Sequence, residues 1–194
     1  KEELNMSGRM TQYIACAVVL CVAIAFAGAA FGQEATYVGD GQCKICHNKK
    51  EEGEQVAKWK ASKHATAFAT LSTDAAKAAA QKKNVSKPPA EAPECLKCHV
   101  TAYDAAKGAA PEKIVKENGV QCESCHGPAS LHTADGKKFK SGDKSVKMDA
   151  HIVAKPDESL CKKCHNAESP TAKPFDFKTA SAQIAHPNPA KAKK

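Results

Sequence analysis

The sequence predicts a small, mainly α fold of short helices and long loops, and three observations lead to this expectation. Hardly any stretch alternates apolar and polar residues as a half-buried strand does. Only 5% of the 194 residues are aromatic, which is poor material for a hydrophobic core. Eight of the 10 cysteines fall in four copies of the pattern C-x-x-C-H. The fold is therefore expected to pack around a bound group that supplies the missing core.

The repeated pattern identifies that group. C-x-x-C-H is the attachment signal for c-type haem, in which both thiols bond to the porphyrin and the histidine binds its iron. The predicted cofactor-binding cysteines are Cys43, Cys46, Cys95, Cys98, Cys122, Cys125, Cys161 and Cys164. The predicted proximal iron ligands are His47, His99, His126 and His165. We therefore expect four haem c groups, with the helices and loops packed around them.

Two other kinds of protein site contain paired cysteines and are alternatives to haem attachment. Zinc ribbons contain C-x-x-C pairs, and thiol redox enzymes contain one such pair. A single C-x-x-C-H would discriminate weakly against either. Four copies, each with its histidine, use every cysteine beyond residue 32 and favour haem over both alternatives.

The charge of the chain does not indicate a nucleic-acid partner. The formal net charge is +8, and Arg9 is the one arginine beside many lysines. A basic surface can bind nucleic acid or an anionic membrane. The propionates of four haems would largely offset this excess, however, and the aromatic residues expected of a single-strand binder are missing.

Residues 1–32 are predicted to be a signal peptide. Arg9 precedes an uncharged run over 13–31, and small residues at 27–32 form cleavage patterns. A retained anchor is the alternative, but the run is near the lower length limit for a span. Its Ala/Gly-rich end favours cleavage, which leaves no stable membrane span. We therefore expect a periplasmic or extracellular protein with a tetrahaem domain over 33–188 and a disordered lysine-rich tail over 189–194.

Periodicity and breakers predict the elements of that domain. Apolar residues at steps of three and four predict a helix over 51–71, and the alanine-rich run after Ser72 and Thr73 predicts another over 74–83. A last short helix is expected over 175–185. The other expected segments are a linker over 85–93, a short strand or turn over 114–118 and a surface loop over 133–149.

Four histidines remain beyond the proximal ones: His64, His132, His151 and His186. Four spare imidazoles for four irons is the number that complete bis-histidine ligation requires. Two imidazoles give a low-spin iron that suits electron transfer, whereas a methionine ligand raises the potential. Met148 is the one methionine beyond the leader, so at most one haem could be His/Met.

Each spare histidine has a plainer interpretation as a surface or loop residue. His64 shares a predicted helix face with Trp59 and Phe68, which favours a ligand. The distance of His132 from the third motif, and the position of His186 after a predicted helix, also favour ligands. His151 lies in a charged approach to the fourth motif, and its roles as ligand and bystander stay equally open.

The chain resembles the tetrahaem cytochromes of the cytochrome c-554 family, known from ammonia-oxidising bacteria. The resemblance covers most of residues 37–166. The most specific segments are GVQCESCHGP from Gly119 and KWKASKHATAFATL around Trp59 and His64. CKICH at Cys43, CLKCHV at Cys95 and CKKCH at Cys161 match in order and approximate spacing.

The resemblance implies a mostly helical fold with closely paired haems and with distal histidines that serve haems attached elsewhere. It implies that His64 lies opposite His126, His132 opposite His47, and His186 opposite His165. In the family's founding members the second-motif haem has no distal protein ligand. Here the segments after the third and fourth motifs are shorter, and His151 is a candidate sixth ligand for the haem on His99.

The function expected from these observations is electron transfer between redox partner proteins. No group of side chains suggests acid-base or nucleophilic catalysis, so no catalytic residue is predicted. One alternative is binding or reduction of nitric oxide or a similar molecule at an open His99 haem. Another is a subunit of an extracellular cytochrome filament or other homo-oligomer, with His151 or His186 donated to a neighbouring copy.

Overall fold

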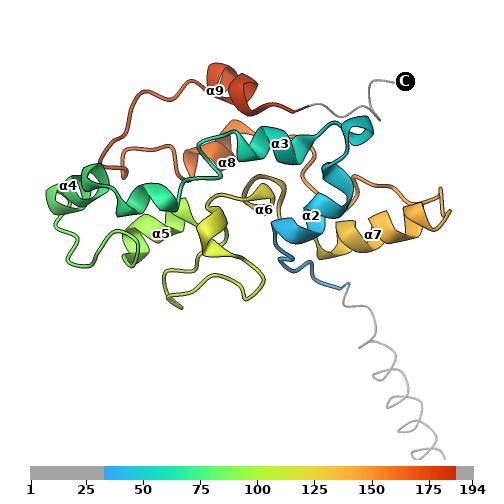
Figure 1. The fold of residues 1–194 in the computed structure, drawn as a ribbon, viewed down its shortest axis with the longest axis horizontal. Coiled ribbons are helices and arrows are strands. Elements are labelled where there is room, and N and C mark those ends of the chain that lie inside the picture. The colour runs from blue at the N-terminus through green and yellow to red at the C-terminus, as the bar shows by residue number, and fades with distance from the viewer. Residues whose placement is uncertain (1–32, 187–194) are drawn as a thin grey trace, which may run out of the picture. The chain divides into compact units, whose positions relative to one another are not determined.

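A computed structural model describes residues 33–186 of the chain (Figure 1). The signal peptide expected over 1–32 and the tail expected over 189–194 lie outside these residues. The described residues from Ala35 onward belong to one compact unit. Between residues 33 and 186, no helix is long and apolar enough to cross a membrane.

The mainly α prediction is confirmed. Across residues 33–186 there is no strand, and the one β-type pairing is an isolated antiparallel bridge between Asp104 and Ala109. The α-helices are α2 (Asp40–His47), α3 (Gln55–Lys60), α4 (Asp74–Lys82), α5 (Pro93–His99), α6 (Cys122–His126), α7 (Ser130–Lys140), α8 (Glu158–Lys162) and α9 (Phe177–Ile184). Three 3₁₀ turns are η1 (Lys50–Glu52), η2 (Ala69–Ser72) and η3 (Lys116–Asn118).

The C-x-x-C-H motifs coincide with helix ends. Helices α2, α5 and α6 end at His47, His99 and His126, and α8 carries Cys161 just before the fourth motif closes in a turn. Residues three apart in a helix are neighbours on one face. A short helix therefore presents both sulfurs of a motif on one side and places the histidine directly after them. Helix α2 also packs against α3 and α6, which brings the first and third motifs together (Figure 1).

Two predicted helices are confirmed, and a side chain caps the N-terminus of each. Helix α4 begins after Thr73, whose Oγ1 accepts a hydrogen bond from the Ala76 amide at 3.2 Å. Helix α9 begins after Asp176, which accepts one from the Thr179 amide at 2.8 Å. Such caps satisfy amides that have no partner within the helix.

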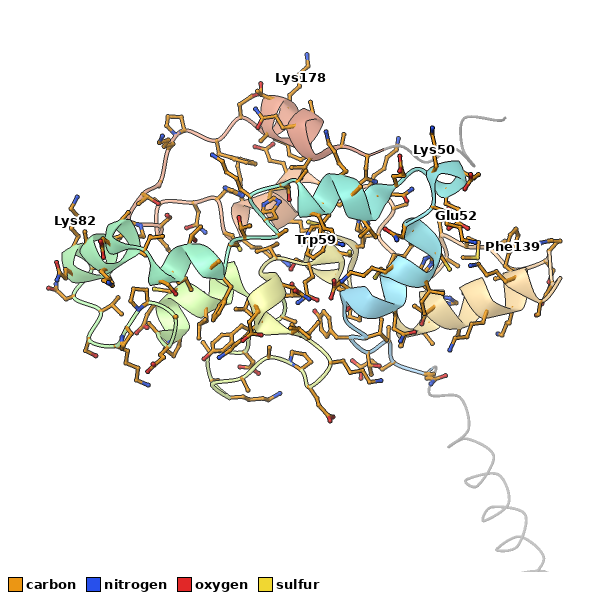
Figure 2. The ribbon with its side chains drawn as sticks, viewed as in Figure 1. Lys50, Glu52, Trp59, Lys82, Phe139 and Lys178 are labelled. Carbon is orange, nitrogen blue, oxygen red and sulfur yellow. The ribbon has the colours of Figure 1, made fainter. Side chains whose placement is uncertain are left out.

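The helix predicted over 51–71 is wrong over most of its length, because α3 ends at Lys60. Contacts with the third-motif segment replace the helical hydrogen bonds. The indole Nε1 of Trp59, a residue labelled in Figure 2, donates to the Val120 carbonyl at 2.8 Å, and the Val120 amide donates to the His64 carbonyl at 2.9 Å. The segment whose apolar spacing indicated a helix therefore forms a series of turns, and His64 lies on one of them.

The surface loop predicted over 133–149 is wrong in its first half, which is the C-terminal part of α7. Its lysines are good helix formers. The lysines in the last turn also stabilise the helix, because their positive charges interact favourably with the negative end of the helix dipole. Asp135 is buried on the inner face, while Phe139 is 38% exposed on the C-terminal half of the helix (Figure 2). The lysine-rich composition suggested an exposed loop and gave no sign of this helix.

The apolar core contributed by the chain is small. It is a cluster of Leu71, Leu96, Val100 and Ile114, with Phe68 and Tyr103 packed against it. Phe139 lies outside this cluster, and the Lys144 ammonium lies 3.8 Å from the centre of its ring. A core of this size leaves room for the burial that porphyrin would supply.

Buried polar side chains join the third motif to the N-terminal segment. The Glu123 carboxylate accepts hydrogen bonds from the amides of Val38 at 3.0 Å, Gly39 at 2.8 Å and Ala129 at 2.8 Å. The side chain of Gln121, 1% exposed, accepts from the Asp40 amide at 3.2 Å and donates to the Val115 carbonyl at 2.8 Å. These bonds satisfy buried backbone groups that no regular element pairs.

We expect Gly119→Ala to destabilise the protein strongly. Gly119 has φ +62°, and a Cβ there would lie 2.6 Å from the His64 carbonyl oxygen. The matched control is Gly108→Ala, because Gly108 has φ +66° but no atom within 4 Å of its Cβ position. The control should lose only about 1 kcal/mol of unfolding free energy, the typical cost of the left-handed backbone. Equal losses in denaturant titrations would contradict the close approach.

Candidate haem-binding sites

Six of the histidines meet in three pairs, each from two distant parts of the chain. The ring centroids are separated by 6.2 Å for His47 and His132, by 6.1 Å for His64 and His165, and by 5.8 Å for His126 and His186. The ring planes of these pairs are inclined by 16°, 68° and 42°.

These separations fit two imidazoles that share one iron. With metal–nitrogen bonds of about 2 Å on either side, the two ring centroids lie roughly 6 Å apart. A structural zinc site would need a convergent group of three or four ligands instead. Residues 33–186 contain no group of three or more His, Cys, Asp or Glu that could hold a metal ion. The donor set therefore fits axial ligation of haem iron.

The pairing differs in part from the one that the resemblance implied. His132 lies beside His47 as expected, but His64 lies beside His165 and His186 lies beside His126. The chain after the fourth motif accounts for the exchange. Phe175 stacks on His165, with centroids 4.8 Å apart and planes inclined by 13°. The chain then continues through α9 and carries His186 to His126.

Backbone carbonyls orient the rings of three histidines, of which His126 and His132 belong to the pairs and His99 does not. An imidazole that binds iron through Nε2 keeps its proton on Nδ1, which then donates to an acceptor and fixes the ring. Nδ1 of His99 lies 2.7 Å from the Ala67 oxygen, that of His126 lies 2.6 Å from the Val153 oxygen, and that of His132 lies 2.8 Å from the Met148 oxygen.

These acceptors, and the ring of Phe175, are functional groups that sequence reasoning missed. A backbone carbonyl has no sequence signal of its own, since every residue carries one. The aromatic partner of His165 could have been suspected from Phe175, which follows the fourth motif within a proline-containing segment. The sequence does not show which face of which ring it covers.

Burial favours the neutral form of one histidine in each pair. Burial, and then the nearby His165, lowers the pKa of His64, and burial likewise lowers the pKa of His132. Burial, and then the neighbouring His126, lowers the pKa of His186. Only the neutral imidazole can bind a metal, so a depressed pKa favours ligation at neutral pH.

His99 and His151 do not form a pair. His47, His126 and His165 each lie opposite a second imidazole ring. Within residues 33–186, no second imidazole lies opposite His99 in this way. Nδ1 of His151 lies 2.7 Å from Oδ2 of Asp135, on α7. The structure thus brings together three of the four pairs that complete bis-histidine ligation would require.

The eight motif cysteines form no disulfide, and side chains of different motifs interact in pairs. A hydrogen bond between the Cys43 and Cys122 thiols raises the pKa of Cys43 and lowers that of Cys122. A hydrogen bond with Cys164 lowers the pKa of Cys98 to about 7. Burial, and then Cys161, raises the pKa of Cys125 to about 11. The attachment points therefore adjoin in the order first, third, fourth and second motif.

Comparison with known proteins gives a consistent result. A family model described as cytochrome c554 and c-prime matches residues 42–127, which include the first three motifs. A curated relative, cytochrome c-554 of Nitrosomonas europaea, is 30% identical over 78% of this chain and 67% of its own. The chain belongs to the cytochrome c554 family. A solved structure of the reduced state of cytochrome c554 from Nitrosomonas europaea is 26% identical and covers 84% of each chain, with a TM-score of 0.47.

Membership of the cytochrome c554 family confirms the resemblance and three broader predictions. The chain is a c-type cytochrome, it binds four haem c groups with iron, and it carries electrons. An electron carrier of this family requires redox partners that donate and accept those electrons. The three imidazole pairs described above fit three of these haems.

Proposed function

We propose that this member of the cytochrome c554 family transfers electrons between two redox proteins through closely packed haems, three of which have two histidine ligands. The observation that carries the proposal is the set of three opposed imidazole pairs at 5.8–6.2 Å. Their proposed axial ligands are His47 with His132, His126 with His186, and His165 with His64. The eight motif cysteines would form the thioether bonds.

Each haem, when bound, supplies an iron that gains and loses one electron. The residues of the chain hold the attachment points in a continuous row. Cys43 is hydrogen-bonded to Cys122 and Cys164 to Cys98, and Cys125 lies near enough to Cys161 to interact with it electrostatically. Backbone carbonyls fix the rings of His99, His126 and His132, so the ligands would need little movement when the iron changes its charge. This arrangement supports a path with the first and second motifs at its ends.

The proposed location is the periplasm or the extracellular space. Export by a signal peptide over 1–32, with a tetrahaem domain over 33–188, agrees with the haem chemistry because c-type haem is attached outside the cytoplasm. The three imidazole pairs form within one chain, so they require no histidine from a second copy. A monomer is therefore the simpler proposal than a filament.

A second candidate function is binding of nitric oxide or a related small molecule at the haem of His99. The observation that favours it is the lack of an opposing imidazole at His99 within residues 33–186. An iron with one axial histidine keeps a position where a small ligand can bind.

Electron paramagnetic resonance of the purified ferric protein tests both candidates. We expect three low-spin haems and one high-spin haem per chain, with nitric oxide changing the spectrum of one haem only. Four low-spin haems and no response to nitric oxide would eliminate the second candidate. Fewer than three low-spin haems would contradict the proposed ligation.

A further inference from the structure

One short segment contacts proposed axial ligands of two different haems. Residues 148–153, here called the strap, begin at Met148, whose carbonyl accepts from Nδ1 of His132 at 2.8 Å. They end at Val153, whose carbonyl accepts from Nδ1 of His126 at 2.6 Å. His132 belongs to the pair with His47, and His126 belongs to the pair with His186.

Further hydrogen bonds hold the strap to the rest of the fold, both at its C-terminal end and in its middle. The Val153 amide donates to the His126 carbonyl at 2.9 Å, so Val153 and His126 are joined by two hydrogen bonds. In the middle of the strap, Nδ1 of His151 lies 2.7 Å from Oδ2 of Asp135. Asp135 is buried on α7, three residues and one helical turn after His132. The His151–Asp135 pair thus ties the strap to the helix that carries His132.

The Met148 carbonyl matters because it accepts a hydrogen bond from His132, whereas His47, the other ring of that pair, has no such acceptor among the described residues. Nδ1 of His47 is buried and has no hydrogen-bond partner among the described residues. The strap therefore supplies the hydrogen bond to Nδ1 for the His47–His132 pair. An acceptor at Nδ1 makes an imidazole a stronger donor to its metal, and hydrogen bonding around the ligands is one of the protein's means of tuning a haem potential.

We propose that the strap sets the potentials of the first- and third-motif haems together, and that His151 is its positioning residue rather than an iron ligand. The carbonyls of Met148 and Val153 strengthen donation by His132 and His126, which stabilises ferric iron and lowers both potentials. His151 keeps the two carbonyls in place through Asp135. This inference rests on the proposed axial pairs.

The test compares two substitutions of His151 in the four-haem protein. His151→Ala removes the bond to Asp135, and we expect the midpoint potentials of the first- and third-motif haems both to rise, with the other two unchanged. His151→Asn keeps an amide N–H near the position of Nδ1 but has no nitrogen that could reach an iron as Nε2 does. It should restore both potentials towards those of the parent. The potentials are followed haem by haem by nuclear magnetic resonance during a redox titration.

The control is Asp143→Asn, in the same loop but outside the strap. Asp143 is exposed and accepts from the Ser145 amide at 3.0 Å, so its loss should leave all four potentials unchanged. Unchanged potentials in His151→Ala, in a protein with the parent's circular dichroism, would overturn the proposal. So would a His99 haem that becomes high-spin in both the Ala and Asn variants, since His151 would then be an iron ligand. Failure of the axial pairs themselves is detected separately, as high-spin iron at the first or third motif in the parent.

Discussion

His186→Ala should convert the haem of His126 from low-spin to high-spin while the haems of His47 and His165 stay low-spin. The ring of His186 lies 5.8 Å from that of His126, and burial holds it neutral and ready to bind iron. Alanine has no group that could replace the imidazole. Ferric electron paramagnetic resonance should therefore show two low-spin haems in place of three.

The same variant decides between the structure's pairing and the one that the resemblance implied. If His186 served the haem of His165, that haem would become high-spin instead. The two haems are distinguished by nuclear magnetic resonance contacts with Val153, which bonds to His126, and with Phe175, which stacks on His165. The matched variant is His64→Ala, which should open the haem of His165, because the rings of His64 and His165 lie 6.1 Å apart. High-spin iron at His165 in His186→Ala would contradict the structure.

The sequence predicted the haem attachment more completely than the path of the chain between the motifs. C-x-x-C-H is a local pattern, because one turn of helix carries both thiols and the ligand. Helices α4 and α9 were also predictable, since their caps at Thr73 and Asp176 are local. These predictions needed no knowledge of distant contacts.

The errors fall where distant contacts decide. The helix expected over 51–71 is interrupted because the His64 carbonyl bonds to Val120, more than fifty residues away. The partners of His64 and His186 could not be read from spacing, since an imidazole can reach any iron that the fold brings near. The hydrogen bond of His151 with Asp135 could not be predicted either, because Asp135 is buried on a helix that the sequence did not indicate.

Glu123→Ala should cause the largest loss of stability among substitutions that leave every attachment motif intact. Glu123 is 3% exposed, and its carboxylate accepts from three buried or half-buried amides, those of Val38, Gly39 and Ala129. Each donor left without an acceptor costs about 1–3 kcal/mol, so the total loss is on the order of 5 kcal/mol. That is comparable with the whole stability of many domains, about 5–15 kcal/mol. Denaturant titration of the four-haem protein measures it.

The reason for so large an effect is that Glu123 lies within the third motif but bonds to the segments before the first motif and before α7. Its loss would loosen α2 and α7 together, and these helices carry His47 and His132. Glu123→Gln keeps one acceptor oxygen and should therefore lose less stability than Glu123→Ala. The exposed Glu117→Ala is the control and should change the unfolding free energy by no more than about 0.5 kcal/mol. If Glu123→Ala loses no more unfolding free energy than this control, the buried carboxylate does not join the first and third motifs. The porphyrins alone must then hold these two motifs together.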